Sequence, residues 1–138
     1  MRGLMASASS ASRPVHLTLR NLSKCAVVIF LQTSGDFLSK EQLAALQTYV
    51  RGGGGFVGIH CAAAGMMTEP WYGELIGAVF TDHPGPQRGI LTIENKDNAI
   101  VAGLPEEWEW FDEWYNFNSN PRAEGDRAVV HQRRDFKL

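Results

Sequence analysis

The apolar positions of the chain alternate between short continuous runs and helical spacing. Residues 26–31 (AVVIFL) form a continuous apolar run with β-branched side chains, which is typical of a strand buried on both faces of a parallel sheet. From Lys40 to Arg51 the apolar residues recur at helical spacing, and Ser39 stands at a capping-box distance from Gln42. We therefore predict a buried strand followed by a helix over Lys40–Arg51.

Four consecutive glycines follow this helix. We expect Gly52 to take the left-handed cap and the glycines after it to form a tight turn. They do not form a phosphate loop, because no Lys-Ser or Lys-Thr pair follows and because they precede a strand. Residues 56–59 (FVGI) are predicted to be that strand, so residues 26–59 indicate a βαβ unit in an open α/β sheet.

The second half of the chain gives weaker patterns. Residues 70–77 are predicted to form a short helix, since Pro suits the first helical position. Residues 88–94 alternate in part and are predicted to be a strand, and a loop is expected over 97–105. The aromatic segment 108–117 is expected to mix extended chain and turn, and 128–131 is a candidate last strand.

Composition and charge restrict the class of protein. The chain has 138 residues, 44% of them apolar, and a net charge of −2, which suits one soluble globular domain. It lacks the basic footprint of a nucleic-acid binder, and its longest apolar run is too short to cross a membrane. Two cysteines, Cys25 and Cys61, could form one disulfide, but they make no disulfide framework, so a reducing, cytoplasmic location is expected.

The beginning of the chain differs in composition from the rest. No acidic residue precedes Asp36, and Ser and Ala dominate residues 1–11. An acid-free, Ser-rich start that carries Arg resembles a mitochondrial transit peptide. The alternative, which we prefer, is a disordered or atypical segment over residues 1–20.

Candidate chemistry lies directly after the second predicted strand. In open α/β sheets, ligands bind beyond the carboxyl ends of the strands, where this strand delivers His60 and Cys61. His60 could act as a base, a metal ligand or a nucleophile, or it could be a hydrogen-bonded histidine at a strand end. Cys61 is more simply a small buried residue than a reactive thiol. His60 need not activate it, because neighbours in extended chain point to opposite sides.

A second set of candidates lies between His83 and Tyr115. His83 precedes a proline and is expected in a loop, where it could approach a site or remain solvated. Asp112 and Glu113 adjoin aromatic residues, a combination that suits sugar rings as well as a solvated acidic face over a Trp core. In extended chain only one of the two carboxylates would enter a given site. A divalent metal at His60 and His83 has weak support, and no nucleotide-cofactor motif is present.

Several stretches together resemble the trehalose-utilisation (ThuA-like) family. The most specific are GFVGIH over residues 55–60 and DEWYNF over 112–117, with PWYGEL over 70–75 and the His83-Pro84 pair between them. The resemblance implies a class I glutamine amidotransferase-like fold, which is a flavodoxin-like three-layer α/β sandwich with a mainly parallel sheet. It also implies that His60 stands where an amidotransferase carries its nucleophilic Cys.

The resemblance further implies a link to the metabolism of trehalose-like or keto-sugar compounds. On that basis His60, His83 and Glu113 are our catalytic candidates. The substrate-binding candidates are Asp112, Trp114, Tyr115, Trp71 and Cys61. A sugar is then the expected small-molecule partner, and a homo-oligomer is left open.

The chain also departs from the family pattern. Members usually have a first strand and helix before the strand at Val27 and several further strands after the segment 112–115. We expect the first strand and helix to be missing here, and the later strands too, apart from the candidate strand at 128–131. We therefore expect a partial family domain over residues 21–131 and a polar tail over 132–138. Two alternatives follow: a non-catalytic binding or assembly module, including an inactive truncated form, or a hydrolase or amidotransferase that uses Cys61 with His83.

Overall fold

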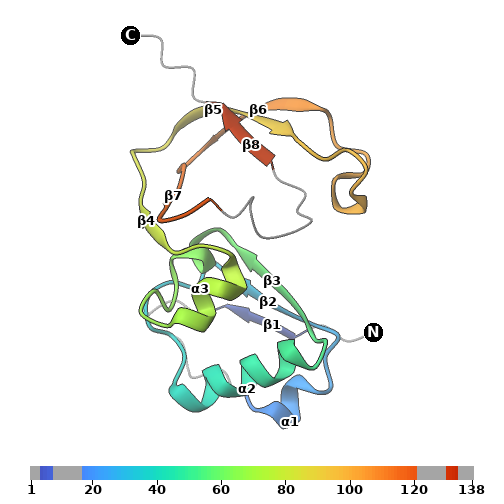
Figure 1. Cartoon of the computed structure of the whole chain (residues 1–138), viewed down its shortest axis with the longest axis vertical. Coiled ribbons are helices and arrows are strands. Elements are labelled where there is room, and N and C mark those ends of the chain that lie inside the picture. Colours follow the sequence, from blue (N-terminus) through green and yellow to red (C-terminus); the bar gives the residue numbers. More distant parts are fainter. Residues whose placement is uncertain (1–3, 8–16, 121–129, 134–138) are drawn as a thin grey trace. The chain divides into compact units, whose positions relative to one another are not determined.

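The computed structural model describes residues 4–7, 17–120 and 130–133 (Figure 1). Contacts divide the chain into two compact units, residues 1–80 and 81–138. Most residues of the segment that carries the transit-peptide interpretation fall outside the described ranges, as do most of the predicted tail and the first two residues of the predicted strand at 128–131. Within those ranges no helix is long and apolar enough to cross a membrane.

The first unit is a parallel sheet with helices. Its three strands lie in the order β1-β2-β3, with all neighbours parallel (Figure 1). In chain order the elements are β1 (Leu4–Ser7), α1 (Leu19–Leu22), β2 (Val27–Leu31), α2 (Lys40–Arg51), β3 (Gly55–Ile59), the 3-10 helix η1 (His60–Ala64) and α3 (Pro70–Ile76). The predicted βαβ unit is therefore confirmed, as are the helices after Ser39 and at Pro70.

The expectation that no strand or helix precedes Val27 is wrong. β1 pairs with β2 in parallel register, from Leu4 opposite Val28 to Ser7 opposite Leu31, and α1 follows β1. A four-residue segment carries too little periodicity to indicate a strand by itself. Its backbone hydrogen bonds are supplied by β2, which is distant in sequence.

Helix α2 begins and ends as the sequence predicts, but the left-handed residue after it is one position further on. The side chain of Ser39 accepts from the Gln42 backbone and the side chain of Gln42 accepts from the Ser39 backbone, so the capping box is complete. At the other end Gly52 has a φ of −79°, and it is Gly53, with a φ of 91°, that takes the left-handed conformation. The next glycine, Gly54, has no room for a side chain, because a Cβ there would lie 2.3 Å from the ring of Tyr49.

The core of the first unit is built around β2. Val28 and Phe30 are fully buried, while the alternate positions Val27, Ile29 and Leu31 are half-buried, so one face of the strand is more deeply covered than the other. The ring of Phe30 packs edge-on against Phe37 and Phe56 and stacks on Tyr72. This aromatic cluster joins the sheet to α3 and to the loop after β2.

The second unit is mostly antiparallel. Its larger sheet has the order β6-β5-β8, formed by β5 (Gln87–Ile93), β6 (Glu107–Asp112) and β8 (Val130–Arg133). A second pairing joins β4 (Phe80–Asp82), which begins at the end of the first unit, to β7 (Asn116–Phe117), and the 3-10 helix η2 (Ala99–Val101) lies within the predicted loop.

The prediction of a mainly parallel sheet is therefore right for the first unit and wrong for the second. A parallel pair needs a long crossover, usually a helix, whereas β5 and β6 are joined by a loop that holds a single short 3-10 helix. The predicted strand at 88–94 and the mixture of strand and turn after Trp108 are confirmed.

Candidate functional site

The carboxyl end of β3 carries His60 in an unusual backbone conformation. His60 is the first residue of η1 and has a φ of 55°. Gln32, which follows β2, and Met66, which follows η1, also have positive φ values, of 53° and 46°. Non-glycine residues in this region are uncommon and are concentrated at functional sites. Three of them thus lie on the loops that leave the carboxyl ends of two neighbouring parallel strands.

The turn at His60 brings its side chain to Cys61. Nδ1 of His60 lies 3.0 Å from Sγ of Cys61, so one of the two donates a hydrogen bond to the other. The expectation that these neighbours point apart assumed extended chain, and it fails because the chain leaves the strand at His60. Both cysteines are free thiols, and Cys25 donates instead to the carbonyl oxygen of Asn21, at 3.6 Å.

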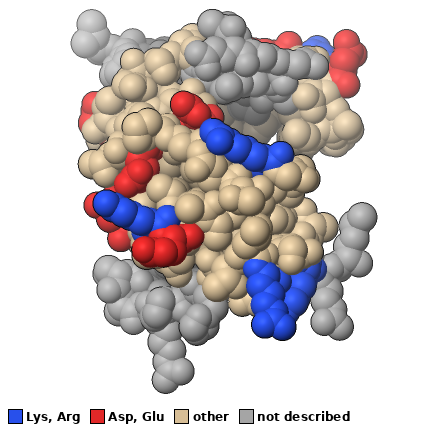
Figure 2. Space-filling model, turned by 60° about the horizontal axis from the view of Figure 1, so that its bottom comes forward, with Lys and Arg blue, Asp and Glu red and all other residues tan. Residues whose placement is uncertain are grey.

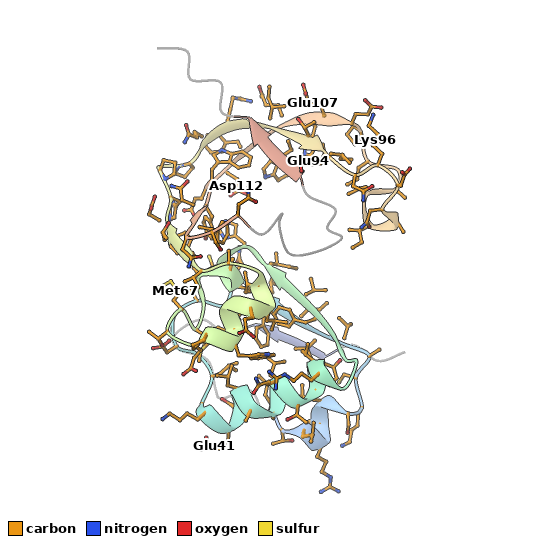
Figure 3. All side chains as sticks on the ribbon, viewed as in Figure 1. Glu41, Met67, Glu94, Lys96, Glu107 and Asp112 are labelled. Carbon is orange, nitrogen blue, oxygen red and sulfur yellow. The ribbon has the colours of Figure 1, made fainter. Side chains whose placement is uncertain are left out.

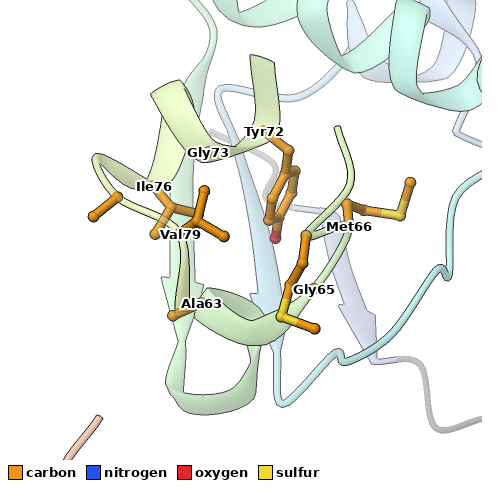
Figure 4. Close-up of a pocket in the computed structure, with 9 residues that line it drawn as sticks. Ala63, Gly65, Met66, Tyr72, Gly73, Ile76 and Val79 are labelled. Atoms are coloured by element: carbon orange, nitrogen blue, oxygen red, sulfur yellow. The ribbon is translucent and has the colours of Figure 1, made fainter. Parts of the chain in front are cut away.

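A narrow apolar crevice lies beside this turn. It is lined by residues of η1, α3 and the segments next to them, and Figure 4 shows Tyr72 between Met66 on one side and Ile76 with Val79 on the other. The space in it for a water-sized sphere is about 0 Å³, so the crevice is too narrow for a ligand. Trp71, a predicted substrate-binding residue, packs against the core of this unit.

Tyr72 holds the 3-10 helix η1 against the core of the first unit. It is 1% exposed and donates a hydrogen bond of 2.9 Å to the carbonyl oxygen of Ala62 in η1. Burial raises the pKa of its phenol well above the ordinary value, while the Thr33 hydroxyl lowers that pKa in part. The tyrosine therefore remains a neutral hydrogen-bond donor that holds η1 in place.

In the second unit, His83 lies directly after β4 and contacts three other groups. Its Nδ1 is 2.9 Å from the carbonyl oxygen of Pro84. Because a carbonyl oxygen only accepts, Nδ1 carries a proton in this contact. Nε2 lies 3.7 Å from Oε2 of Glu113, and the His83 ring stacks on Tyr115 at 5.3 Å between centroids.

Glu113 links these groups. Its Oε2 also lies 3.5 Å from the hydroxyl of Tyr115, which donates to it. The side chains of His83 and Glu113 are 33% and 31% exposed, so both reach solvent. The arrangement offers an imidazole, a carboxylate and a phenol within one partly covered cluster, which we call the His83 cluster (His83, Glu113 and Tyr115).

Asp112 points elsewhere. One of its carboxylate oxygens accepts from the indole nitrogen of Trp110, at 3.1 Å, and the other accepts from the backbone nitrogen of Glu113, at 2.9 Å. Asp112 closes β6, and Glu107 lies at the other end of that strand (Figure 3). Its contacts therefore hold the turn that presents Glu113.

Trp114 is a packing residue in this structure. It is 8% exposed, its indole nitrogen donates to the carbonyl oxygen of Gln87 at 2.8 Å, and its ring lies against Gly89. A Cβ at Gly89 would approach the ring to 2.6 Å. Neither of these contacts joins Trp114 to the His83 cluster, so its role in substrate binding stays a prediction.

Two groups that position the candidate residues were not predicted from the sequence. The Pro84 carbonyl sets the protonated nitrogen of His83, and Trp110 occupies one oxygen of Asp112. The signal for Trp110 was present in the alternation of residues 107–112 (EWEWFD), which places Trp108, Trp110 and Asp112 on one face of β6. No sequence pattern indicates a backbone carbonyl as a partner.

The predicted site residues therefore form two groups, one in each unit. His60, Cys61 and Trp71 belong to the first unit, and the His83 cluster belongs to the second with Asp112 and Trp114. Among the described residues, no three His, Cys, Asp or Glu side chains gather as a metal site would require. On the face shown in Figure 2, basic and acidic side chains are interspersed.

These features define an α/β protein with a parallel βαβ unit and a histidine at the carboxyl end of its third strand. The family model for ThuA, described as trehalose utilisation, matches residues 3–136. The chain belongs to this family.

Two solved structures are similar to the chain. A ThuA-like protein from Bacteroides uniformis ATCC 8492 is 29% identical, with a TM-score of 0.69 over 77% of this chain and 44% of that one. A ThuA-like protein from Parabacteroides merdae ATCC 43184 is 19% identical, with a TM-score of 0.66 over 80% of this chain and 49% of that one. The chain thus spans about half the length of each. No curated protein matches the chain.

Proposed function

We propose that this chain is a ThuA-like domain that binds a carbohydrate of the trehalose or keto-sugar class at the His83 cluster. The observation that carries the proposal is the stacking of His83 on Tyr115 with Nε2 of His83 directed at the Glu113 carboxylate. The family's link to trehalose utilisation supports the ligand class. The context that we propose for it is a flavodoxin-like architecture in a cytoplasmic setting.

The chemistry of the cluster suits a polyhydroxylated ligand. The carboxylate of Glu113 accepts hydrogen bonds from sugar hydroxyls, and the aromatic rings offer apolar faces to a sugar ring. In the proposed role, Nε2 of His83 accepts a proton from a hydroxyl, and the protonated ring then pairs with Glu113. His83 and Glu113 would in this way act as an acid–base pair, with Tyr115 orienting both. His60 is the catalytic candidate of the first unit.

The experiment titrates the purified chain with trehalose and with a keto-sugar, followed by calorimetry and by the NMR signals of the His83 ring. We expect Glu113→Gln to weaken binding about ten-fold or more, since a hydrogen bond to a charged group contributes about 1.5–3 kcal/mol. The matched control is Glu109→Gln, which breaks the exposed ion pair with Arg88 in the same unit. The proposal fails if neither sugar binds or if both variants bind as the wild type does.

A second candidate function, a non-catalytic assembly module, is favoured by the exposed side chains of β6. Trp110 is 52% exposed and Phe111 is 62% exposed on this edge strand of the second sheet. Edge strands with exposed apolar residues pair with other chains. Sedimentation over a range of concentrations tests this: a homo-oligomer that Phe111→Lys converts to monomer supports the candidate, and a wild-type monomer at all concentrations removes it.

A further inference from the structure

The two cysteines of the chain have different surroundings. Neither forms a disulfide, both are half-buried, and each has a hydrogen-bonding contact through sulfur. The partner of Cys25 is a backbone carbonyl, which can only accept, whereas the partner of Cys61 is the imidazole of His60. Of these two partners, only the imidazole is basic enough to take the proton of a thiol, so the two sites differ in chemistry even though both residues are half-buried.

The geometry at Cys61 depends on the left-handed turn at His60. In extended chain, neighbouring side chains point to opposite faces. Because His60 has a φ of 55° and begins η1, its ring turns back and Nδ1 reaches Sγ of Cys61 at 3.0 Å. The Tyr72 hydrogen bond to Ala62 anchors the same 3-10 helix one residue further on. The thiol and the imidazole are thus held together by backbone conformation and packing.

We propose that Cys61 is a nucleophilic thiol served by His60, and that it exchanges with small disulfides to form a mixed disulfide. Nδ1 of His60 takes the thiol proton as Sγ attacks one sulfur of the disulfide. The new S–S bond forms as the old one breaks, and the leaving sulfur takes the proton from the imidazolium. The small disulfide is the oxidant, one thiol is released, and atoms and electrons balance.

This inference is independent of the proposed carbohydrate function. The thiol–imidazole pair lies in the first unit and the His83 cluster lies in the second. Failure of sugar binding would leave the thiol proposal standing, and the reverse also holds. The proposed reaction gives Cys61 a role as a site of reversible covalent modification, and its substrates are small disulfides.

The test uses Cys25 as an internal comparison. In Cys25→Ser protein the reaction of Cys61 with dithiodipyridine is followed by absorbance, and the reaction of Cys25 is followed in Cys61→Ser protein. Each rate is divided by the rate of the same thiol in the denatured chain. We expect the normalised rate of Cys61 to exceed that of Cys25 by about ten-fold or more, because general-base catalysis typically contributes at least that much.

The role of His60 is tested by His60→Asn in the Cys25→Ser background. Asn tolerates the left-handed conformation and lacks an imidazole, so the turn is retained while the base is removed. We expect the rate to fall to that of Cys25 and added imidazole to restore part of it. Equal normalised rates for the two cysteines, or an unchanged rate in His60→Asn, would overturn the proposal. If His60→Asn does not fold, the comparison of Cys61 with Cys25 still decides.

Discussion

The two units of the chain differ in how much aromatic surface they leave exposed. In the first unit, Phe30 is fully buried, and it contacts three other rings inside the core. In the second unit, Trp110 and Phe111 are 52% and 62% exposed. Among the described residues of the second unit, the buried apolar side chains are Ile93, Val101 and Trp114.

This difference follows from the two kinds of sheet. A parallel sheet needs crossover helices, and these helices bury the strand faces they cover, as α2 and α3 do around β2. An antiparallel pair such as β5 and β6 needs no helix, so one face can carry charged residues like Arg88 and Glu109. The first unit therefore buries its aromatic side chains in a core, whereas the second leaves Trp110 and Phe111 exposed.

The largest loss of stability is expected from a substitution at the centre of the core of the first unit. Phe30→Ala should destabilise the first unit by about 3–5 kcal/mol, because it removes a fully buried ring and leaves a cavity. Hydrogen exchange of the amides of β2 and β3 measures the loss, with β5 and β6 as the reference. Equal loss of protection in both units would show that they unfold as one and would break the comparison.

A smaller loss of stability is expected where Gly89 packs against Trp114 in the second unit. Gly89→Ala places a Cβ against the ring of Trp114 and should destabilise this unit by about 1–3 kcal/mol through overpacking. The matched control is Gly85→Ala, since no atom lies within 4 Å of a Cβ there. Trp fluorescence during urea unfolding compares the two variants, and similar midpoints would mean that Trp114 is not fixed against Gly89.

Tyr72→Phe should cost the first unit about 1 kcal/mol, because the carbonyl oxygen of Ala62 loses its donor. The pH dependence of the free energy of unfolding also changes in this variant. Burial raises the pKa of Tyr72 in the folded chain, so its stabilising term is complete below the unfolded value of about 10 and is lost as the pH rises above it. Urea unfolding at neutral and at alkaline pH should show a smaller alkaline loss in Tyr72→Phe than in the wild type. An identical alkaline loss would contradict this assignment.

The smallest effect is expected at the surface of the second unit. Arg88→Ala removes the exposed ion pair with Glu109 and should change stability by less than about 1 kcal/mol. Thermal unfolding at low and high salt measures it, with any difference from the wild type shrinking as salt rises. A large, salt-independent loss would show that this face is packed, and the contrast between the two units would then be weaker than the exposures indicate.

The sequence predicted the elements whose signals are local. The apolar run at 26–31 and the capping box at Ser39 gave β2 and α2, with α2 correct to the residue. The glycine run was also correctly assigned to a turn, although the left-handed residue is Gly53 instead of Gly52. Such features depend on the spacing of residues within one stretch of chain, and this spacing can be read directly from the sequence.

Elements with non-local partners could not be predicted in this way. β1 is four residues long and is fixed by pairing with β2, more than twenty residues away. The antiparallel direction of β5 and β6 likewise depends on how the chain returns after β5, and their register decides which residues share a face. The candidate site divides similarly: the residue types of the His83 cluster were identified, but their contacts were not.

By itself, the sequence determined the family, the βαβ unit and the residue types that carry the chemistry. The tertiary structure decided which of these side chains meet. His60 contacts Cys61 because the chain leaves β3 in a left-handed turn, and Glu113 contacts His83 from thirty positions away because Asp112 and Trp110 hold the turn after β6. The physical reason is that periodicity and capping are local, whereas contacts between distant residues depend on the path of the backbone and the packing around it.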